Sequence, residues 1–308
     1  MKNSTPFEVI IIGGSYAGLS TAMSLGRALR NVLVIDSGLP CNRQTPHSHN
    51  FLTQDGRKPQ EIADIALEQV HQYETVHFHK GLAIDATKSE DIFEVETASG
   101  EVFSARKLIF ATGIKDTMPA INGFAECWGI SVIHCPYCHG YEVRKQKTGI
   151  IANGEGAIHY ARLINQWTDD LTLFTNGAST LTDEQTTKLT KHNISIIETP
   201  ITEIVHTNGQ MEAVVLEDGS SIGLSAIYNR PAFVQHCPII EKLGCELNEH
   251  GLIKVTGFQK TNVPGVFACG DNSNMARSVA MAVSSGSMTG ALVNHELIEE
   301  DFQIMERV

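Results

Sequence analysis

The sequence predicts an α/β protein made of two three-layer domains of alternating strands and helices. A short strand-like run, 8–12, leads through a glycine turn into a helical stretch that reaches about Arg30, and a second strand-like run follows at 31–35. The same order of strand, glycine turn, helix and strand returns between about 148 and 174. Two such units in a chain of 308 residues predict two domains of the nucleotide-binding type.

Further strands and one long helix complete the predicted elements. Residues 92–113 alternate as strands do around a Ser99-Gly100 turn, and strand-like runs also follow the second unit. Residues 265–271 are typical of a strand that ends in a turn, and a helix rich in alanine, methionine and valine is expected from about 277 to 299. No low-complexity or proline-rich linker separates these parts.

Composition and charge exclude two classes of protein. The formal net charge is −12, whereas a nucleic-acid-binding surface needs clustered lysine and arginine. No apolar run reaches the roughly 20 residues that span a bilayer, so we expect no membrane segment. Residues 1–7 are polar and are followed by only four apolar residues before the glycine turn, which is too short for a signal peptide. We therefore expect a cytoplasmic protein.

The first glycine turn carries a dinucleotide-binding pattern. Gly13-x-Ser15-x-x-Gly18 matches Gly-x-Gly-x-x-Gly with serine in the middle, a turn that lets backbone N–H groups and a helix N-terminus approach a pyrophosphate. Asp36 ends the next strand, where a carboxylate accepts a hydrogen bond from a ribose hydroxyl. An ordinary glycine turn is the alternative, but the flanking strands, helix and acid favour a binding site. The candidate residues are Gly13, Ser15, Tyr16, Ala17, Gly18, Asp36 and Ser37.

A closely spaced cysteine pair is the most informative feature of the chain. Of seven cysteines, only Cys135 and Cys138 are near each other, and two intervening residues allow a small disulfide ring. His134 and His139 flank the pair, where an imidazole can stabilise a thiolate or carry its proton. The thiolate is the nucleophile in thiol–disulfide exchange. These four residues are the candidate catalytic group.

Two other interpretations of the pair fit less well. A structural zinc site needs four ligands, and no second Cys-x-x-Cys is present, so we expect no metal. Cys-Pro-Tyr-Cys also occurs in glutaredoxin-type domains, but near the start of a small domain rather than in the middle of a chain. The remaining cysteines are expected to be isolated. The other histidines, including His47, His49, His77 and His79, are expected to be surface or local hydrogen-bonding residues.

Together these motifs resemble the low-molecular-weight thioredoxin reductase family over essentially the whole chain. The landmarks are Gly13 to Gly18, Ala111-Thr112-Gly113, Cys135 to Cys138, Gly270-Asp271 and the helix opened by Arg277. The resemblance implies two Rossmann-like domains: a discontinuous FAD-binding domain at 1–116 and 246–308, and an inserted NAD(P)H-type domain at 117–245 that carries the cysteine pair. It also implies a homodimer.

The resemblance also implies roles for individual residues. Thr112, Gly113 and Gly270 would join the FAD site, with Asp271 at the flavin ribitol. Ser278 and Val279, at the start of the last helix, would lie at the edge of the flavin ring, where a helix N-terminus stabilises negative charge. In the second domain, Cys135 would be the interchange thiol that meets the substrate and Cys138 the flavin-side thiol. His139, assisted by His134, would be the acid/base, with Glu142 a weaker candidate.

The second nucleotide-binding unit departs from the family pattern. Ala152 replaces the first glycine of its turn, and only Gly154 and Ala157 fit. NADPH-dependent members follow the next strand with arginines that hold the 2′-phosphate, whereas this chain has Thr175-Asn176-Gly177. A dianionic phosphate is poorly held without a cation. We therefore expect NADPH to be a poor ligand.

The segment around the cysteines also differs from that of ordinary thioredoxin reductases. His139 stands where ordinary thioredoxin reductases have an aspartate, and the string His-Cys-Pro-Tyr-Cys-His-Gly-Tyr-Glu resembles the flavin dithiol oxidases of fungal and bacterial secondary metabolism. Those enzymes close a disulfide in a small molecule and pass the electrons through FAD to oxygen. We expect an FAD-dependent thiol–disulfide oxidoreductase, acting as a dithiol oxidase on a small-molecule dithiol or a thioredoxin-like protein. An NAD(P)H-dependent disulfide reductase and a flavin-containing redox sensor without turnover are the alternatives.

Overall fold

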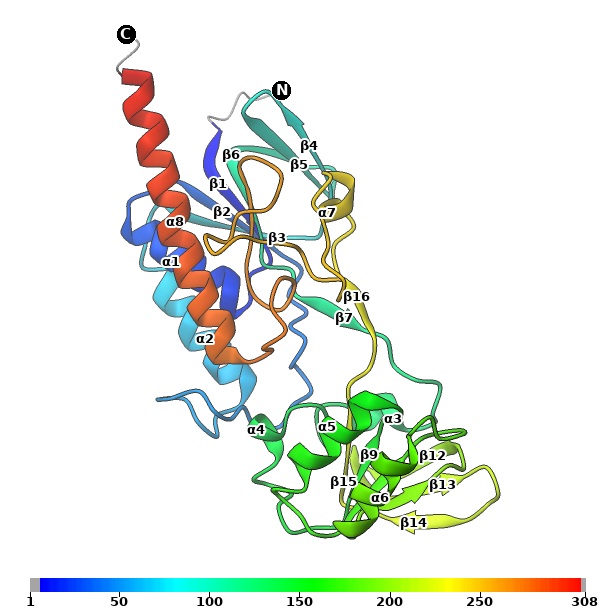
Figure 1. The fold of residues 1–308 in the computed structure, drawn as a ribbon. Coiled ribbons are helices and arrows are strands. Elements are labelled where there is room, and N and C mark those ends of the chain that lie inside the picture. The colour runs from blue at the N-terminus through cyan, green and yellow to red at the C-terminus, as the bar shows by residue number, and fades with distance from the viewer. Residues whose placement is uncertain (1–5, 306–308) are drawn as a thin grey trace. The chain divides into compact units, whose positions relative to one another are not determined.

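Strand β1 (Phe7–Ile12) is central to the first of two sheets that contain parallel strands. Val9, Ile10 and Ile11 are completely buried, as expected for a parallel strand covered on both faces. The computed structural model describes residues 6–305, apart from the side chain of Ile304 (Figure 1). Within that range the chain forms two compact units, which are described separately below.

The sheet of the first unit has seven strands in the order β3-β2-β1-β6-β5-β4, with β17 also pairing with β6. The added strands are β2 (Val32–Asp36), β3 (Val76–Lys80), β4 (Ala83–Ser89), β5 (Ile92–Thr97), β6 (Val102–Phe110) and β17 (Val266–Ala268). Strands β3, β2, β1, β6 and β17 are parallel, whereas β4 and β5 form an antiparallel extension. The carboxyl ends of the parallel strands therefore share one edge of the sheet.

Four helices belong to this unit. They are α1 (Tyr16–Arg27), α2 (Pro59–Val70), α7 (Ile239–Lys242) and α8 (Val279–Met305). Figure 1 shows α8 lying along α1. The two helices approach closely: the Thr21 hydroxyl donates to the Gly286 carbonyl at 3.0 Å, and a Cβ added at Gly286 would lie 2.1 Å from the carbonyl oxygen of Ala17. Gly286 therefore permits the contact between α8 and the first turn of α1.

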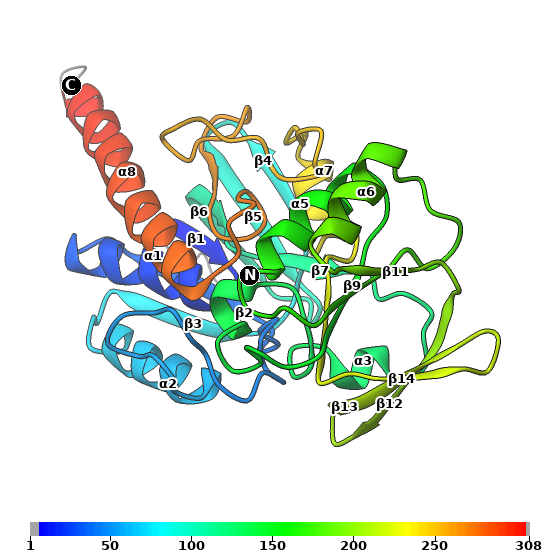
Figure 2. The ribbon, with the colours of Figure 1, turned by 60° about the horizontal axis from the view of Figure 1, so that its bottom comes forward.

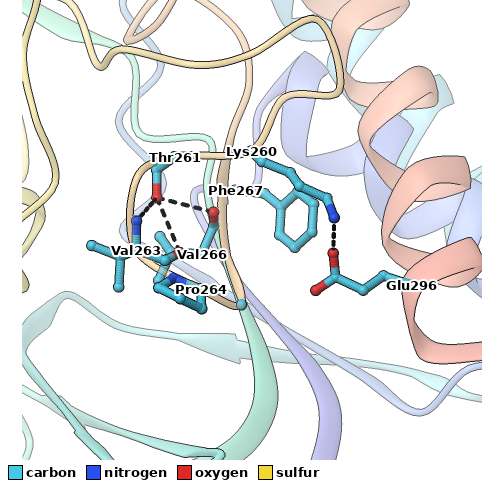
Figure 3. Close-up of a pocket in the computed structure, with 8 residues that line it drawn as sticks. Lys260, Thr261, Val263, Pro264, Val266, Phe267 and Glu296 are labelled. Carbon is cyan, nitrogen blue, oxygen red and sulfur yellow. Dashed lines mark hydrogen bonds and ion pairs between the residues drawn. The ribbon is translucent and has the colours of Figure 1, made fainter. Parts of the chain in front are cut away.

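Ion pairs hold the C-terminal half of α8 against the sheet. Lys107, which is 4% exposed, donates to the carboxylates of Glu296 and Glu300. Arg106 adds ion pairs to Glu300 and Asp301. Figure 3 shows Glu296 paired with Lys260 at a pocket of approximately 240 Å³, where Thr261 donates to the Val266 carbonyl within the neighbouring turn. None of the predicted site residues lines this pocket.

The second unit has its own parallel sheet, ordered β11-β10-β9-β15-β8. Its strands are β8 (Val132–Ile133), β9 (Thr148–Ile151), β10 (Leu171–Phe174), β11 (Ser195–Ile197) and β15 (Ala226–Asn229). Helix α5 (Glu155–Ile164) packs against β9, β10 and α6 (Asp183–Lys191) (Figure 2). A three-stranded antiparallel sheet follows, formed by β12 (Ile201–Thr207), β13 (Gln210–Leu216) and β14 (Ser221–Gly223).

Short elements complete the described chain. These are α3 (Phe124–Cys127), α4 (Pro136–His139) and the paired strands β7 (Ile114–Asp116) and β16 (Phe233–Gln235). The predicted elements match the observed ones closely, although α1 ends at Arg27 and α8 starts at Val279. Within residues 6–305, no helix combines the length and apolar character that crossing a membrane requires.

The division into units differs from the predicted domain boundaries in two segments. The second unit comprises 44–59 and 116–232, so it includes a segment from the predicted FAD domain. The Gln44 side chain accounts for part of this, because it donates to the Trp128 carbonyl at 2.8 Å. Residues 233–245 join the first unit instead, because Ile239 and Ile240 of α7 are completely buried in its core.

Candidate active site

The glycine turn of the first unit leads directly from β1 into α1. Gly13 has φ +106°, and a Cβ at Gly18 would lie 1.8 Å from the Gly13 carbonyl oxygen, so both positions require glycine. Ser15 precedes the helix in extended conformation without capping it, and no acidic residue lies in the first turn. Because the Ser15 side chain makes no capping hydrogen bond and no acid lies nearby in the helix, the start of α1 suits an anionic pyrophosphate.

Asp36 joins this turn to the end of β2. Its two carboxylate oxygens accept the backbone N–H groups of Gly14 at 2.9 Å and Gly38 at 3.0 Å. Each oxygen keeps a further lone pair, so the carboxylate can also accept ribose hydroxyls. The structure thus brings the sequence-predicted residues of the turn, together with Asp36 and the adjacent Ser37, to one edge of the first sheet.

The ends of β6 and β17 bring the next predicted residues to the same edge. Thr112 and Gly113 follow β6, and Gly270 and Asp271 follow β17, which pairs with β6. Asn272, which the sequence analysis did not identify, is completely buried beside them. Its amide nitrogen donates to the Phe110 carbonyl at 2.9 Å, whereas its side-chain oxygen has no hydrogen-bond partner within residues 6–305. A buried acceptor without a partner fits a donor from a bound molecule.

The segment before α8 holds the last of the predicted cofactor residues. Arg277 Nε lies 3.6 Å from Asp271 Oδ2, and both side chains are largely buried. The Ser278 hydroxyl accepts the backbone N–H of Met281, and Val279 begins the helix. The glycine turn before α1, the Asp36 carboxylate and the Asn272 oxygen together fit a dinucleotide with a hydroxylated chain, as in FAD.

Helix α4 carries the cysteine pair directly after β8 in the second unit. Cys135 and Cys138 form a disulfide, with their Cα atoms 5.3 Å apart. Cys135 is the N-cap residue in extended conformation, Pro136 is buried at the start of the helix, and the backbone N–H of His139 donates to the Cys135 carbonyl at 3.1 Å. Two residues of helix are thus enough to place both sulfurs within bonding distance.

Buried aromatic side chains fix the position of this helix. The Tyr160 hydroxyl donates to the backbone carbonyl of His134 at 2.6 Å, and burial raises the pKa of Tyr160, so the group remains a donor. The His134 ring stacks on Trp128, with ring centroids 5.7 Å apart. Tyr228 is also buried close by and contacts Tyr160 edge to face. No local sequence pattern pointed to Tyr160 or Tyr228, because they come from α5 and β15.

His139 lies in an environment that favours its neutral form. Burial lowers its pKa below the usual 6.5, the nearby His49 lowers it further, and Glu142 opposes the shift. A neutral imidazole beside a disulfide can accept a proton from an incoming thiol. His49 was expected to be a surface or local residue. Its contact with Asp55 is local, but its contact with Glu142, at 3.6 Å, joins segments far apart in the chain.

The second glycine turn is closed by contacts within the protein. The Asn153 side-chain oxygen accepts the backbone N–H groups of Gly154 and Thr180, both at 2.9 Å, and the Asn153 amide nitrogen donates to the Ala178 carbonyl. Glu155 adds a carboxylate to the first turn of α5. Neither helix has a side-chain cap from its N-cap residue, but only α5 carries an acid in its first turn.

The other cysteines lie apart from the pair. Cys127, Cys237, Cys245 and Cys269 are buried and Cys41 is exposed. Burial raises the pKa of all four buried thiols, which disfavours the reactive thiolate.

Comparison with known proteins shows the family of the chain. The family model described as pyridine nucleotide-disulphide oxidoreductase matches residues 7–286, so the chain belongs to this family of FAD-binding flavoproteins. It is an enzyme of the thioredoxin reductase-like disulfide oxidoreductase class. The predicted fold class, with two Rossmann-like domains, is confirmed.

Individual relatives extend over nearly the whole chain. The "Thioredoxin reductase sirT" of Leptosphaeria maculans is 34% identical over 313 residues, covering 96% of this chain and 95% of the relative. Among solved structures, an oxidoreductase from Agrobacterium tumefaciens is 42% identical with a TM-score of 0.89, covering 96% of this chain and 99% of that one. The structure of HlmI is 33% identical with a TM-score of 0.93, covering 100% and 97%.

Proposed function

We propose that the protein is an FAD-dependent dithiol oxidase that uses the Cys135–Cys138 disulfide. The principal support is the pairing of this disulfide with the partly buried His139, in a unit whose nicotinamide-type turn is closed by Asn153 and Thr180. The bound FAD would supply a two-electron acceptor, with oxygen as the final oxidant. The first unit would hold it through the glycine turn, Asp36, Asp271 and Asn272.

The chain's own residues would carry out the exchange with the substrate. His139 takes the proton of one substrate thiol, and the resulting thiolate attacks Cys135, breaking its bond to Cys138. The second substrate thiol then displaces Cys135, which closes the substrate disulfide and leaves both enzyme sulfurs reduced. Two electrons and two protons leave the dithiol in this half-reaction. His134, stacked on Trp128, would assist by stabilising negative charge at the adjacent sulfur.

Poor use of NADPH follows from the second glycine turn. Besides the Gly154 amide, which donates to Asn153, this turn has the Glu155 carboxylate in the first turn of α5, and that negative charge disfavours a pyrophosphate. Asn176 is also engaged, because its side-chain oxygen accepts the backbone N–H of Ile201 at 2.8 Å. Charge-assisted hydrogen bonds are worth about 1.5–3 kcal/mol each, so a 2′-phosphate without a cation would bind at least about tenfold more weakly. NADH, which lacks that phosphate, would be the better nicotinamide donor of the two.

An anaerobic titration of the purified yellow protein tests the proposal. We expect dithiothreitol to bleach the flavin, NADPH and NADH to leave it oxidised at ordinary enzyme rates, and air to restore the colour rapidly. Rapid bleaching by NADPH with micromolar affinity would instead support a disulfide reductase, which is the activity that the name of the L. maculans relative gives. A flavin that turns over with neither reductant would indicate a redox sensor.

We also propose a small-molecule dithiol or a thioredoxin-like protein as the substrate, a cytoplasmic location and a homodimer. The homodimer is supported by exposed apolar side chains on α8, namely Met281, Met288, Ile298, Phe302 and Met305. At 100° per residue they fall within about a third of the helix circumference. One helix face is therefore available for a second copy of the chain.

A further inference from the structure

A closed loop in the second unit presents His49. The backbone N–H of Ser48 donates to the Arg57 carbonyl at 2.7 Å, and that of Gly56 donates to the Ser48 carbonyl at 2.9 Å. His47 Nδ1 lies 2.9 Å from the Gly56 carbonyl and adds to the closure. These contacts fix both ends of the loop, so His49 projects from a held backbone rather than from a free one.

The ring of His49 lies between two carboxylates. Its Nδ1 atom is 3.7 Å from Asp55 Oδ1, and its Nε2 atom is 3.6 Å from Glu142 Oε1. The His49 side chain is only 21% exposed, compared with 66% for Asp55 and 42% for Glu142. Asp55 is itself fixed, because its Oδ1 atom accepts the backbone N–H of Asn50 at 2.7 Å.

Glu142 connects this loop to the redox helix. It follows His139 by three residues, at the end of the segment that begins with the disulfide. Two neighbouring groups act on the pKa of His139 with opposite effects: His49, when protonated, favours the neutral imidazole, and the Glu142 carboxylate favours the protonated one. Asp55 faces His49 from the other side, and the His47 ring lies 6.5 Å from it.

We propose that His49 and Glu142 are positioning residues of the active site, which hold and balance the charge around His139 while it takes the substrate proton. The inference rests on the proposed role of His139 and extends it to two residues outside the Cys-x-x-Cys segment. Before the thiol arrives, His49 favours the neutral base. Once His139 carries the proton, the Glu142 carboxylate stabilises the imidazolium until the proton leaves to solvent.

Direct titration of His139 by NMR tests this in the oxidised protein, with selectively labelled histidine and His139→Gln for assignment. His49→Gln should raise the pKa of His139 and Glu142→Gln should lower it. His192→Gln, at an exposed histidine of the same unit, is the matched control, and it should leave the titration unchanged. A purely structural role would not shift the two variants in opposite directions. Because a rise of one pKa unit lowers the neutral fraction by less than tenfold at a pH close to the pKa, dithiol reduction of His49→Gln near pH 6 should be about two- to fivefold slower.

The outcomes separate this inference from the proposed function. If the titration of His139 in both His49→Gln and Glu142→Gln coincides with that of the unaltered protein, the inference is wrong, whatever the turnover. If the opposite shifts appear but His139→Gln reacts with dithiothreitol at the normal rate, the proposed acid/base role fails while the charge coupling stands. Should His49→Gln fail to fold, the direction of the Glu142→Gln shift decides the inference alone.

Discussion

At the scale of single residues, the two cysteines occupy unlike positions on α4. Cys135 is the N-cap, outside the helix, whereas Cys138 lies within it. If Cys135 is the interchange thiol, Cys138→Ser should leave a Cys135 thiolate that attacks a disulfide and becomes trapped as a mixed disulfide. Incubation with glutathione disulfide should therefore add one glutathione to Cys138→Ser, measured by intact mass, and label Cys135→Ser much more slowly. Equal labelling of the two variants would reject unequal roles.

The pKa of His139 gives a pH prediction. Burial and the neighbouring His49 hold this pKa below its usual 6.5, although Glu142 opposes them. The neutral base should therefore persist at pH 7, and dithiol-driven flavin reduction should decline only below about pH 6.5. His139→Gln should slow the reaction by about 100-fold or more across the range. A stopped-flow pH profile measures both effects, and an acid limb lying well above pH 7 would contradict the assignment.

The lowered pKa of His139 also makes the folding stability of the protein depend on pH. Because the folded state resists protonating His139, the unfolded chain binds that proton first as the pH falls. The contribution of His139 to folding stability is therefore full above about pH 6.5 and decreases as the pH falls through that value toward the lower pKa of the folded state.

At the scale of elements, the packing of α8 on α1 connects the C-terminal helix to the glycine turn. Gly286→Ala would place a methyl group 2.1 Å from the Ala17 carbonyl oxygen, which can be relieved only by a backbone shift at the start of α1. We expect weaker FAD retention and a loss of about 1–3 kcal/mol in unfolding free energy. Fluorimetric FAD titration and denaturant unfolding measure these effects. Gly257→Ala, where a Cβ would meet no atom within 4 Å, is the matched control and should be unchanged.

The ion pairs of α8 predict sensitivity to acid. Burial alone would raise the pKa of Glu296, but hydrogen bonds and charge from Lys107 and Lys260 outweigh it and lower the pKa below 4.5. This stabilisation is present above about pH 4.5 and is lost as the pH falls through the lower folded-state pKa. Lys107→Met should reduce unfolding free energy at pH 7 by about 1–3 kcal/mol and flatten its decline between about pH 5 and 3. Denaturant unfolding at several pH values measures both, and an unchanged acid limb would exclude this contribution.

At the scale of the whole molecule, the proposed homodimer predicts the hydrodynamic mass. A 33.6 kDa chain should sediment at about twice that mass if the apolar face of α8 is covered by a second copy. Phe302→Asp, at a side chain that is 60% exposed, should shift the equilibrium toward monomer without lowering the unfolding temperature of dilute protein. A monomer at every concentration, or a dimer unaffected by this charge, would exclude that face as the interface.

The sequence by itself determined the elements whose signals are local. The turn at 13–18, the acid at Asp36 and the Cys135–Cys138 pair each depend on a few neighbouring residues, because turn geometry and ring closure act over short stretches of chain. The replacement of a glycine by Ala152 in the second turn could also be recognised, because the spacing of the residues in a glycine turn is fixed. These features were enough to predict the α/β class and the thioredoxin reductase-like resemblance, both of which are confirmed.

Only the tertiary structure decided which distant residues surround those features. His49 reaches Glu142 because the loop 44–59 belongs to the second unit, and Asn272 becomes a buried acceptor because β17 pairs with β6. Thr180 closes the second turn from beyond the next strand. Each of these contacts joins residues whose separation along the chain carries no periodic signal, so burial and hydrogen bonding place them only when the sheets have formed.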